Sequence, residues 1–113
     1  MDEVVRAGDL EIDLGRGLVR LRGEVISVTR SEWLLLQYLA ANAGQVMRTA
    51  DVLSAVWDPE RREDVQRLRV CVSRLRRKLG ASGGESAAAI KTIHGTGYML
   101  DAESPPSAPA SSS

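Results

Sequence analysis

One segment of the chain, from Glu63 to Leu79, limits the possible folds more than any other. At about 100° of rotation per helical residue, its apolar residues line up on one side: Val65, Leu68, Val72, Leu75 and Leu79. The opposite side carries Gln66, Arg67, Val70, Ser73, Arg74 and Arg77. A helix with this pattern buries its stripe against a protein body and turns its arginines outward. Arg69 and Arg76 lie beside the stripe, where acids of the body can pair with them, and Cys71 lies on the other flank.

The charges of the chain are segregated, although 15 basic and 15 acidic residues give a net charge of zero. Residues 61–80 contain eight basic and two acidic side chains, so this segment carries +6 and the rest of the chain −6. Thirteen of the 15 basic residues are arginine, whose planar guanidinium matches phosphates and guanine edges. A field polarised in this way favours a polyanionic partner on one face.

The first 28 residues predict short antiparallel strands, because apolar and polar residues alternate between tight turns. The expected strands are 4–6, 10–14, 18–21 and 25–28. A capping box from Thr29 to Glu32 then begins a mostly buried helix, and Gly44 is expected as its C′ residue.

A second, shorter helix is expected after a short extended piece at 46–48, with Thr49 as its N-cap. Leu53 and Trp57 form its inner stripe, and Pro59 breaks the helix after Asp58. The segment 58–62 is then a charged loop that leads to the basic helix, or Asp58 and Pro59 are instead the N-cap and the first residue of that helix.

The C-terminal part predicts a hairpin and a tail. Strand-like residues at 90–93 and 98–100 flank His94, and Gly95 and Gly97 are expected to serve turn geometry. Residues 102–113 are rich in Ser, Pro and Ala and are expected to be disordered. One domain at 1–101 is therefore expected, of the α+β class: a winged helix-turn-helix with an N-terminal antiparallel sheet, three helices and a C-terminal hairpin wing.

The residues give little support for catalysis, a metal or a cofactor. One cysteine and one histidine exclude an internal disulfide and a Cys/His zinc site. The segment 95–100 lacks the third glycine of a dinucleotide fingerprint and follows no βα unit. No apolar run is long enough to cross a membrane. Because a single cysteine cannot form an internal disulfide, a cytoplasmic location is expected, with Cys71 as a small half-buried side chain rather than a redox sensor.

On the residues alone, the basic helix has a DNA-binding and a protein-binding interpretation. A helix of this width fits the major groove of B-DNA, where arginine, glutamine and valine can contact base edges. Alternatively, the basic face is simply solvated or docks an acidic protein without binding DNA. Acids that would pair with it at helical spacing are scarce after Asp64, which favours DNA.

Five segments in order resemble the effector domain of OmpR/PhoB-type response regulators: residues 28–36, 44–48, 53–57, 70–79 and 90–98. Together they span nearly all of residues 4–101. The resemblance implies sequence-specific binding of double-stranded DNA for transcription regulation, with the basic helix in the major groove. Base or groove contacts are then implied for Gln66, Arg67, Val70, Ser73 and Arg74, and phosphate or flanking contacts for Trp57, Arg76 and Arg77.

The hairpin would be the wing, with Thr92 and His94 at the adjacent minor groove or backbone. The family usually has arginine where His94 stands, which weakens the fixed positive charge of this wing. Trp57 either donates its indole N–H to a phosphate or packs as a core residue. The loop is either a contact for RNA polymerase or an inert connector, and its residues are Asp58, Pro59, Glu60, Arg61 and Arg62.

Response regulators of this family carry an N-terminal receiver domain, and no such segment precedes Met1 in this sequence. We therefore expect either a separated effector domain, which a receiver outside this chain controls, or a stand-alone regulator. The domain is expected to be a monomer alone and to bind DNA in tandem pairs on half-sites one helical turn apart.

Overall fold

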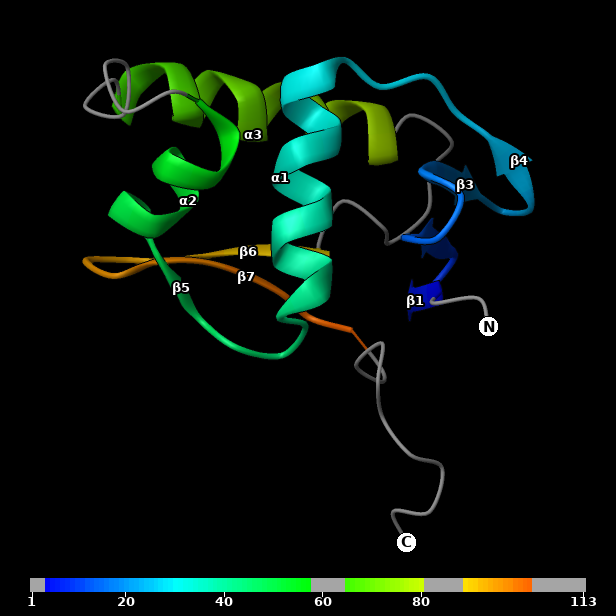
Figure 1. Ribbon diagram of the computed structural model, residues 1–113, viewed down its shortest axis with the longest axis horizontal. Coiled ribbons are helices and arrows are strands. Elements are labelled where there is room, and N and C mark those ends of the chain that lie inside the picture. Colours follow the sequence, from blue (N-terminus) through cyan, green and yellow to red (C-terminus); the bar gives the residue numbers. More distant parts are fainter. Residues whose placement is uncertain (1–3, 58–64, 81–88, 103–113) are drawn as a thin grey trace, which may run out of the picture.

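The computed structural model describes residues 4–57, 65–80 and 89–102 (Figure 1). They begin with a four-stranded antiparallel sheet of β1 (Val4–Ala7), β2 (Leu10–Asp13), β3 (Leu18–Leu21) and β4 (Glu24–Val25). Next come α1 (Arg30–Ala41), β5 (Met47–Arg48), α2 (Thr49–Val56) and α3 (Val65–Gly80). The hairpin of β6 (Ile90–Ile93) and β7 (Gly97–Leu100) joins β5 in a second sheet of order β5-β7-β6. This architecture confirms the predicted winged helix-turn-helix.

α1 packs on both sheets. Figure 1 shows α1 at the centre, the four-stranded sheet on one side of it and α2 on the other, while α3 runs across α1. In this view the second sheet lies below α2 and crosses the lower part of α1, and its hairpin turn lies on the side of α2. One apolar core joins these elements, with Ile12, Leu36, Leu75 and Leu100 fully buried in it.

The N-terminal sheet follows the predicted alternation, because Val5, Ile12 and Val19 are paired across three strands and all are buried. Three predicted strands have other bounds in the structure, and the one predicted at 4–6 continues to Ala7. The strand predicted at 10–14 ends at Asp13, whose carboxylate accepts the Arg16 N–H at 3.0 Å and so turns the chain. The strand predicted at 25–28 is only Glu24–Val25, because the chain leaves the sheet there to reach the start of α1.

The capping box of α1 is confirmed. Thr29 Oγ1 accepts the Glu32 N–H at 3.2 Å, and Glu32 Oε1 accepts the Thr29 N–H at 2.8 Å. The prediction of Gly44 as the C′ residue is wrong, since Asn42 is the C-cap. Gly44 has a φ of +82° and donates its N–H to Leu100 O at 2.9 Å, so it turns the chain onto β7 instead.

The start of α2 also differs from the prediction. Arg48 is the N-cap and makes no side-chain capping bond, whereas Thr49 is the first helical residue. The N–H and the hydroxyl of Thr49 donate to Thr96 O at 3.0 and 3.3 Å. Thr49, which the sequence predicted as the N-cap, therefore bonds the wing turn instead. Leu53 is buried as predicted.

The buried side of α3 is wider than the predicted stripe. Val65, the first residue of the helix, is 38% exposed, so its assignment to the stripe is wrong. The buried residues of α3 are Leu68, Cys71, Val72, Leu75 and Leu79. Their spacing is the i, i+3, i+4, i+7 pattern of an ordinary globular helix, and it places Cys71 in the core.

The two glycines of the wing have different roles. Gly95 has a φ of +78° and fits the predicted turn. Gly97 has no positive φ, and a Cβ there would overlap the carbonyl oxygen of Met47. Gly97 is therefore required by the close approach of β5 to β7, which corrects its assignment to turn geometry.

Parts of three predictions fall outside the described residues: the loop 58–62, the first two residues of the predicted basic helix at 63–64 and, apart from a partly buried Ala102 that packs on the core, the tail 102–113. Within the three described ranges, no helix is long and apolar enough to cross a membrane.

Candidate nucleic-acid interface

The solvent-facing side of α3 has the composition that the sequence predicted. We call it the outer face, and all its members are exposed: Gln66, Arg67, Val70, Ser73, Arg74 and Arg77. Val70 is a valine with 40% of its surface exposed in the middle of this face. Three guanidinium groups, two polar side chains and one apolar contact are thus presented together along one helix.

The outer face continues into a groove between α3 and the neighbouring helices. Thr29 and Ser31 at the start of α1 and Trp57 at the end of α2 line it together with Arg74 and Arg77 of α3. The groove therefore combines positive charge with apolar surface, which suits a nucleic-acid backbone better than an apolar ligand.

Trp57 lies between the core and the groove. It is partly buried against the core, and it also lines the groove. The Arg67 guanidinium carbon lies 5.9 Å from the centroid of the Trp57 ring, within the range of a cation–π contact. This contact places a cation of the outer face beside the indole ring.

Arg76 is directed away from the outer face and toward the hairpin. Its Nε and Nη2 donate to Ile90 O at 3.0 and 2.8 Å, and Nη2 also donates to Thr92 Oγ1 at 2.7 Å. The expectation that Arg69 and Arg76 pair with acids is wrong for Arg76, whose partners are a carbonyl and a hydroxyl. Among the described residues, Arg69 is exposed and makes no ion pair.

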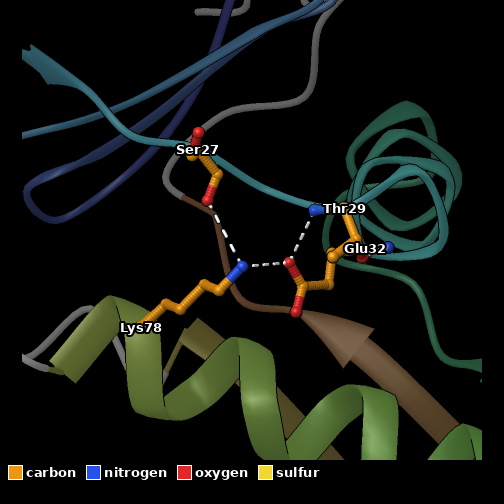
Figure 2. Close-up of polar contacts among 4 residues, drawn as sticks. All are labelled: Ser27, Thr29, Glu32 and Lys78. Atoms are coloured by element: carbon orange, nitrogen blue, oxygen red, sulfur yellow. Dashed lines mark hydrogen bonds and ion pairs between the residues drawn. The ribbon is translucent and has the colours of Figure 1, made fainter.

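Lys78, on the second flank of α3, forms hydrogen bonds with residues at the start of α1 (Figure 2). Its Nζ donates to Glu32 Oε1 at 2.6 Å and to Ser27 O at 3.3 Å. Glu32 as a whole residue is only 2% exposed, whereas the Lys78 side chain is 38% exposed. Burial opposes ionisation of Glu32, but the hydrogen bonds from Lys78 and Thr29 outweigh it and lower the pKa of this carboxyl.

Sequence reasoning missed the Glu32–Lys78 pair. The capping box identified Glu32, but its second partner is 46 residues away and no local pattern indicates it. Reasoning also missed Arg48, an exposed cation that pairs with Asp51 at 3.2 Å. Strand pairing sets Arg48 opposite Gly97 of the wing, so it extends the cationic surface toward the hairpin turn.

The wing residues are placed as predicted: Thr92 on β6 and His94 in the turn are both exposed. Cys71, in contrast, is 7% exposed rather than half-buried. Burial, assisted by the charge of Glu32, raises the pKa of the Cys71 thiol to about 11, so the thiol is protonated at neutral pH. In the part of the chain that the structure describes, no three His, Cys, Asp or Glu residues are grouped to hold a metal ion.

Comparison with known sequences places this geometry in a family. The family model "Transcriptional regulatory protein, C terminal" matches residues 23–100. The sensory transduction protein RegX3 of Mycobacterium tuberculosis is 32% identical over 100 residues, which cover 88% of this chain and 44% of RegX3. The transcriptional activator protein IrlR of Burkholderia pseudomallei is 34% identical over 101 residues, with 89% and 43% covered. The chain thus spans less than half the length of these relatives.

Solved structures agree. The C-terminal effector domain of BfmR from Acinetobacter baumannii has a TM-score of 0.68 at 34% identity, covering 88% of this chain and 90% of that domain. The RstA DNA-binding domain of Klebsiella pneumoniae, solved in complex with the RstA box, has a TM-score of 0.66 at 28% identity, covering 88% and 97%. Since the family match spans more than half of the chain, the chain belongs to the transcriptional regulatory protein C-terminal family, the DNA-binding effector domains of OmpR/PhoB-type response regulators.

Proposed function

We propose that the protein binds duplex DNA sequence-specifically to regulate transcription, by inserting the outer face of α3 into the major groove. The observation that carries this proposal is that all six residues of the outer face are exposed on a helix whose other side is anchored in the core. The major groove is about 12 Å wide and admits one helix. The function of the family, which consists of transcriptional regulators and not of enzymes, agrees with this placement.

Base readout is assigned by the chemistry of each side chain. Arg67 and Arg74 can each donate two hydrogen bonds to guanine, and Gln66 can pair with adenine. Val70 is suited to a thymine methyl group, because contact with that group removes an exposed apolar side chain from water. Ser73 completes the set as a donor or acceptor for a neighbouring base edge.

Phosphate contacts are assigned to the margins of the outer face. Arg77 lines the groove beside α1, and Trp57 can direct its indole N–H to a phosphate there. His94 and Thr92 lie on the wing for the adjacent minor groove or backbone. Such contacts supply affinity and orientation, whereas the base contacts supply selectivity.

The context of the domain in the cell is also proposed. One effector domain makes few contacts, so tandem pairs on repeated half-sites are expected, spaced about one helical turn apart. The expected protein partners in the cytoplasm are a receiver domain and RNA polymerase. The loop 58–62 would contact the polymerase. RegX3 and IrlR are more than twice as long as the match, which leaves room for a receiver in those proteins.

A selection followed by a salt titration tests the function. Duplexes bound by the protein are enriched from a random pool, and the dissociation constant of the enriched duplex is measured against a scrambled duplex from low to high salt. We expect an enriched motif and a linear fall of log affinity with log salt. No enriched motif would contradict the proposal, and weak binding without salt dependence would favour a protein-interaction module.

A further inference from the structure

Arg76 stands apart from the other cations of α3, because its guanidinium group is directed at the open edge of the wing. In the sheet order β5-β7-β6, strand β6 has a neighbour on one side only. Ala89 O accepts the Asp101 N–H at 2.7 Å. Since carbonyl groups alternate along an antiparallel strand, Ile90 O is turned to the open edge, where Arg76 bonds it through two nitrogens.

The same guanidinium also bonds Thr92, two residues further along the same strand. Ile90 and Thr92 are two residues apart on β6. Because the planar guanidinium of Arg76 has fixed donor directions and bonds both residues, it fixes the distance and the twist of β6 relative to α3. Among the described residues, all side-chain hydrogen bonds between α3 and the hairpin come from Arg76. The apolar side of α3 packs chiefly on α1 and α2 instead.

We propose that Arg76 is a positioning residue that holds the wing at a fixed place relative to the outer face of α3, with Thr92 as its partner. This inference rests on the proposed function and replaces direct DNA contacts for Arg76 and for Thr92. Two DNA-contacting elements that are already fixed lose less conformational entropy on binding than two that must be ordered. Arg76 thus strengthens DNA binding through the wing.

The test uses four variants of the full chain: Arg76→Met, Thr92→Val, the double variant, and Arg77→Met as control. Arg77 is the adjacent residue, and it lies on the outer face. Affinity for the selected duplex is measured as a function of salt concentration. Hydrogen exchange of the β6 and β7 amides is measured by NMR in the free protein. All measurements are made well below the unfolding temperature, so that a role in global stability alone does not change the affinity.

We expect Thr92→Val, which removes no charge, to weaken binding about threefold to tenfold, as loss of one hydrogen bond does. Arg76→Met weakens binding more, and the double variant is no weaker than Arg76→Met alone. Both single variants accelerate exchange in the wing. Arg77→Met lowers the salt dependence by about one ion and leaves wing exchange unchanged.

Three outcomes would overturn the inference. Unchanged wing exchange in Arg76→Met, with a salt dependence reduced by about one ion, makes Arg76 a phosphate ligand. Losses that add in the double variant make Thr92 an independent DNA contact. Wild-type affinity in Thr92→Val removes its role as partner, and this variant decides the question even where Arg76→Met does not fold. If wild-type protein selects no duplex, the proposed function fails, whereas the exchange measurement still decides whether Arg76 holds the wing.

Discussion

The outer face of α3 and the two flanks of the same helix use cations for opposite purposes. Arg74 and Arg77 are exposed on the outer face, whereas Arg76 is bonded to the wing and Lys78 to the buried Glu32. The charge of +6 over residues 61–80 therefore overstates the positive charge offered to DNA. Some cations of this basic helix therefore fix its orientation within the fold.

The largest effect is expected from breaking the Lys78 flank. Glu32→Ala leaves the Thr29 N–H without its acceptor and leaves the Lys78 ammonium with Ser27 O alone. We expect a loss of about 2–3 kcal/mol in the free energy of unfolding, less than for a fully buried pair because Lys78 can rehydrate.

Urea unfolding measures this loss, with Glu11→Ala as the matched control. Glu11 forms an ion pair with Arg6 at 3.6 Å in which the Arg6 side chain is 63% exposed, so its removal should cost less than about 1 kcal/mol. Equal losses in the two variants would show that Lys78 is no anchor.

Removal of one arginine from the outer face should have the opposite profile. Arg74→Ala is expected to cost about 1–3 kcal/mol on the selected duplex and less on random DNA. Its free energy of unfolding should stay within about 0.5 kcal/mol of the wild type. Equal losses on the two duplexes would move Arg74 from base to phosphate contact, and binding at wild-type strength would remove it from the interface.

The pH dependence of stability separates the two regions further. Because the pKa of Glu32 is lowered in the folded protein, its contribution is present above the unfolded pKa and is lost as the pH falls through the folded pKa. As the pH is lowered, the free energy of unfolding should therefore decrease less steeply in Glu32→Gln than in the wild type. Arg77→Gln should follow the wild-type curve, and parallel curves for wild type and Glu32→Gln would refute the anchor.

The smallest effect is expected at the wing turn. His94→Arg supplies a permanent charge, and we expect about twofold to threefold tighter binding at low salt, with the gain lost at high salt through screening. His94→Gln is the neutral control. No difference between the arginine and glutamine variants would show that the wing turn does not approach DNA.

Local chemistry made much of the fold predictable. The capping box at Thr29 and the alternation around Ile12 depend on neighbours within a few residues, and both are present in the structure. The outer face of α3 was predictable because helical periodicity alone separates it from the core. The assignment of individual residues to bases or phosphates stays a prediction.

The rest depends on contacts between distant segments. Thr49 bonds the wing turn rather than capping α2, and Gly97 makes room for β5. The partners of Arg76 and Lys78 lie 14 to 51 residues away. Helical periodicity placed Arg76 beside the stripe, apart from Arg74 and Arg77, but no local pattern indicates the partners of Arg76 on the wing or of Lys78 at the start of α1.

An amide chemical-shift map of the labelled protein, titrated with the selected duplex and with a scrambled duplex of equal length, shows directly which elements contact DNA. We predict that the selected duplex shifts the amides of α3 from Gln66 to Arg77 and those of the wing turn, while β1 to β4 stay unchanged. Shifts concentrated in the four-stranded sheet, with α3 unaffected, would contradict this prediction.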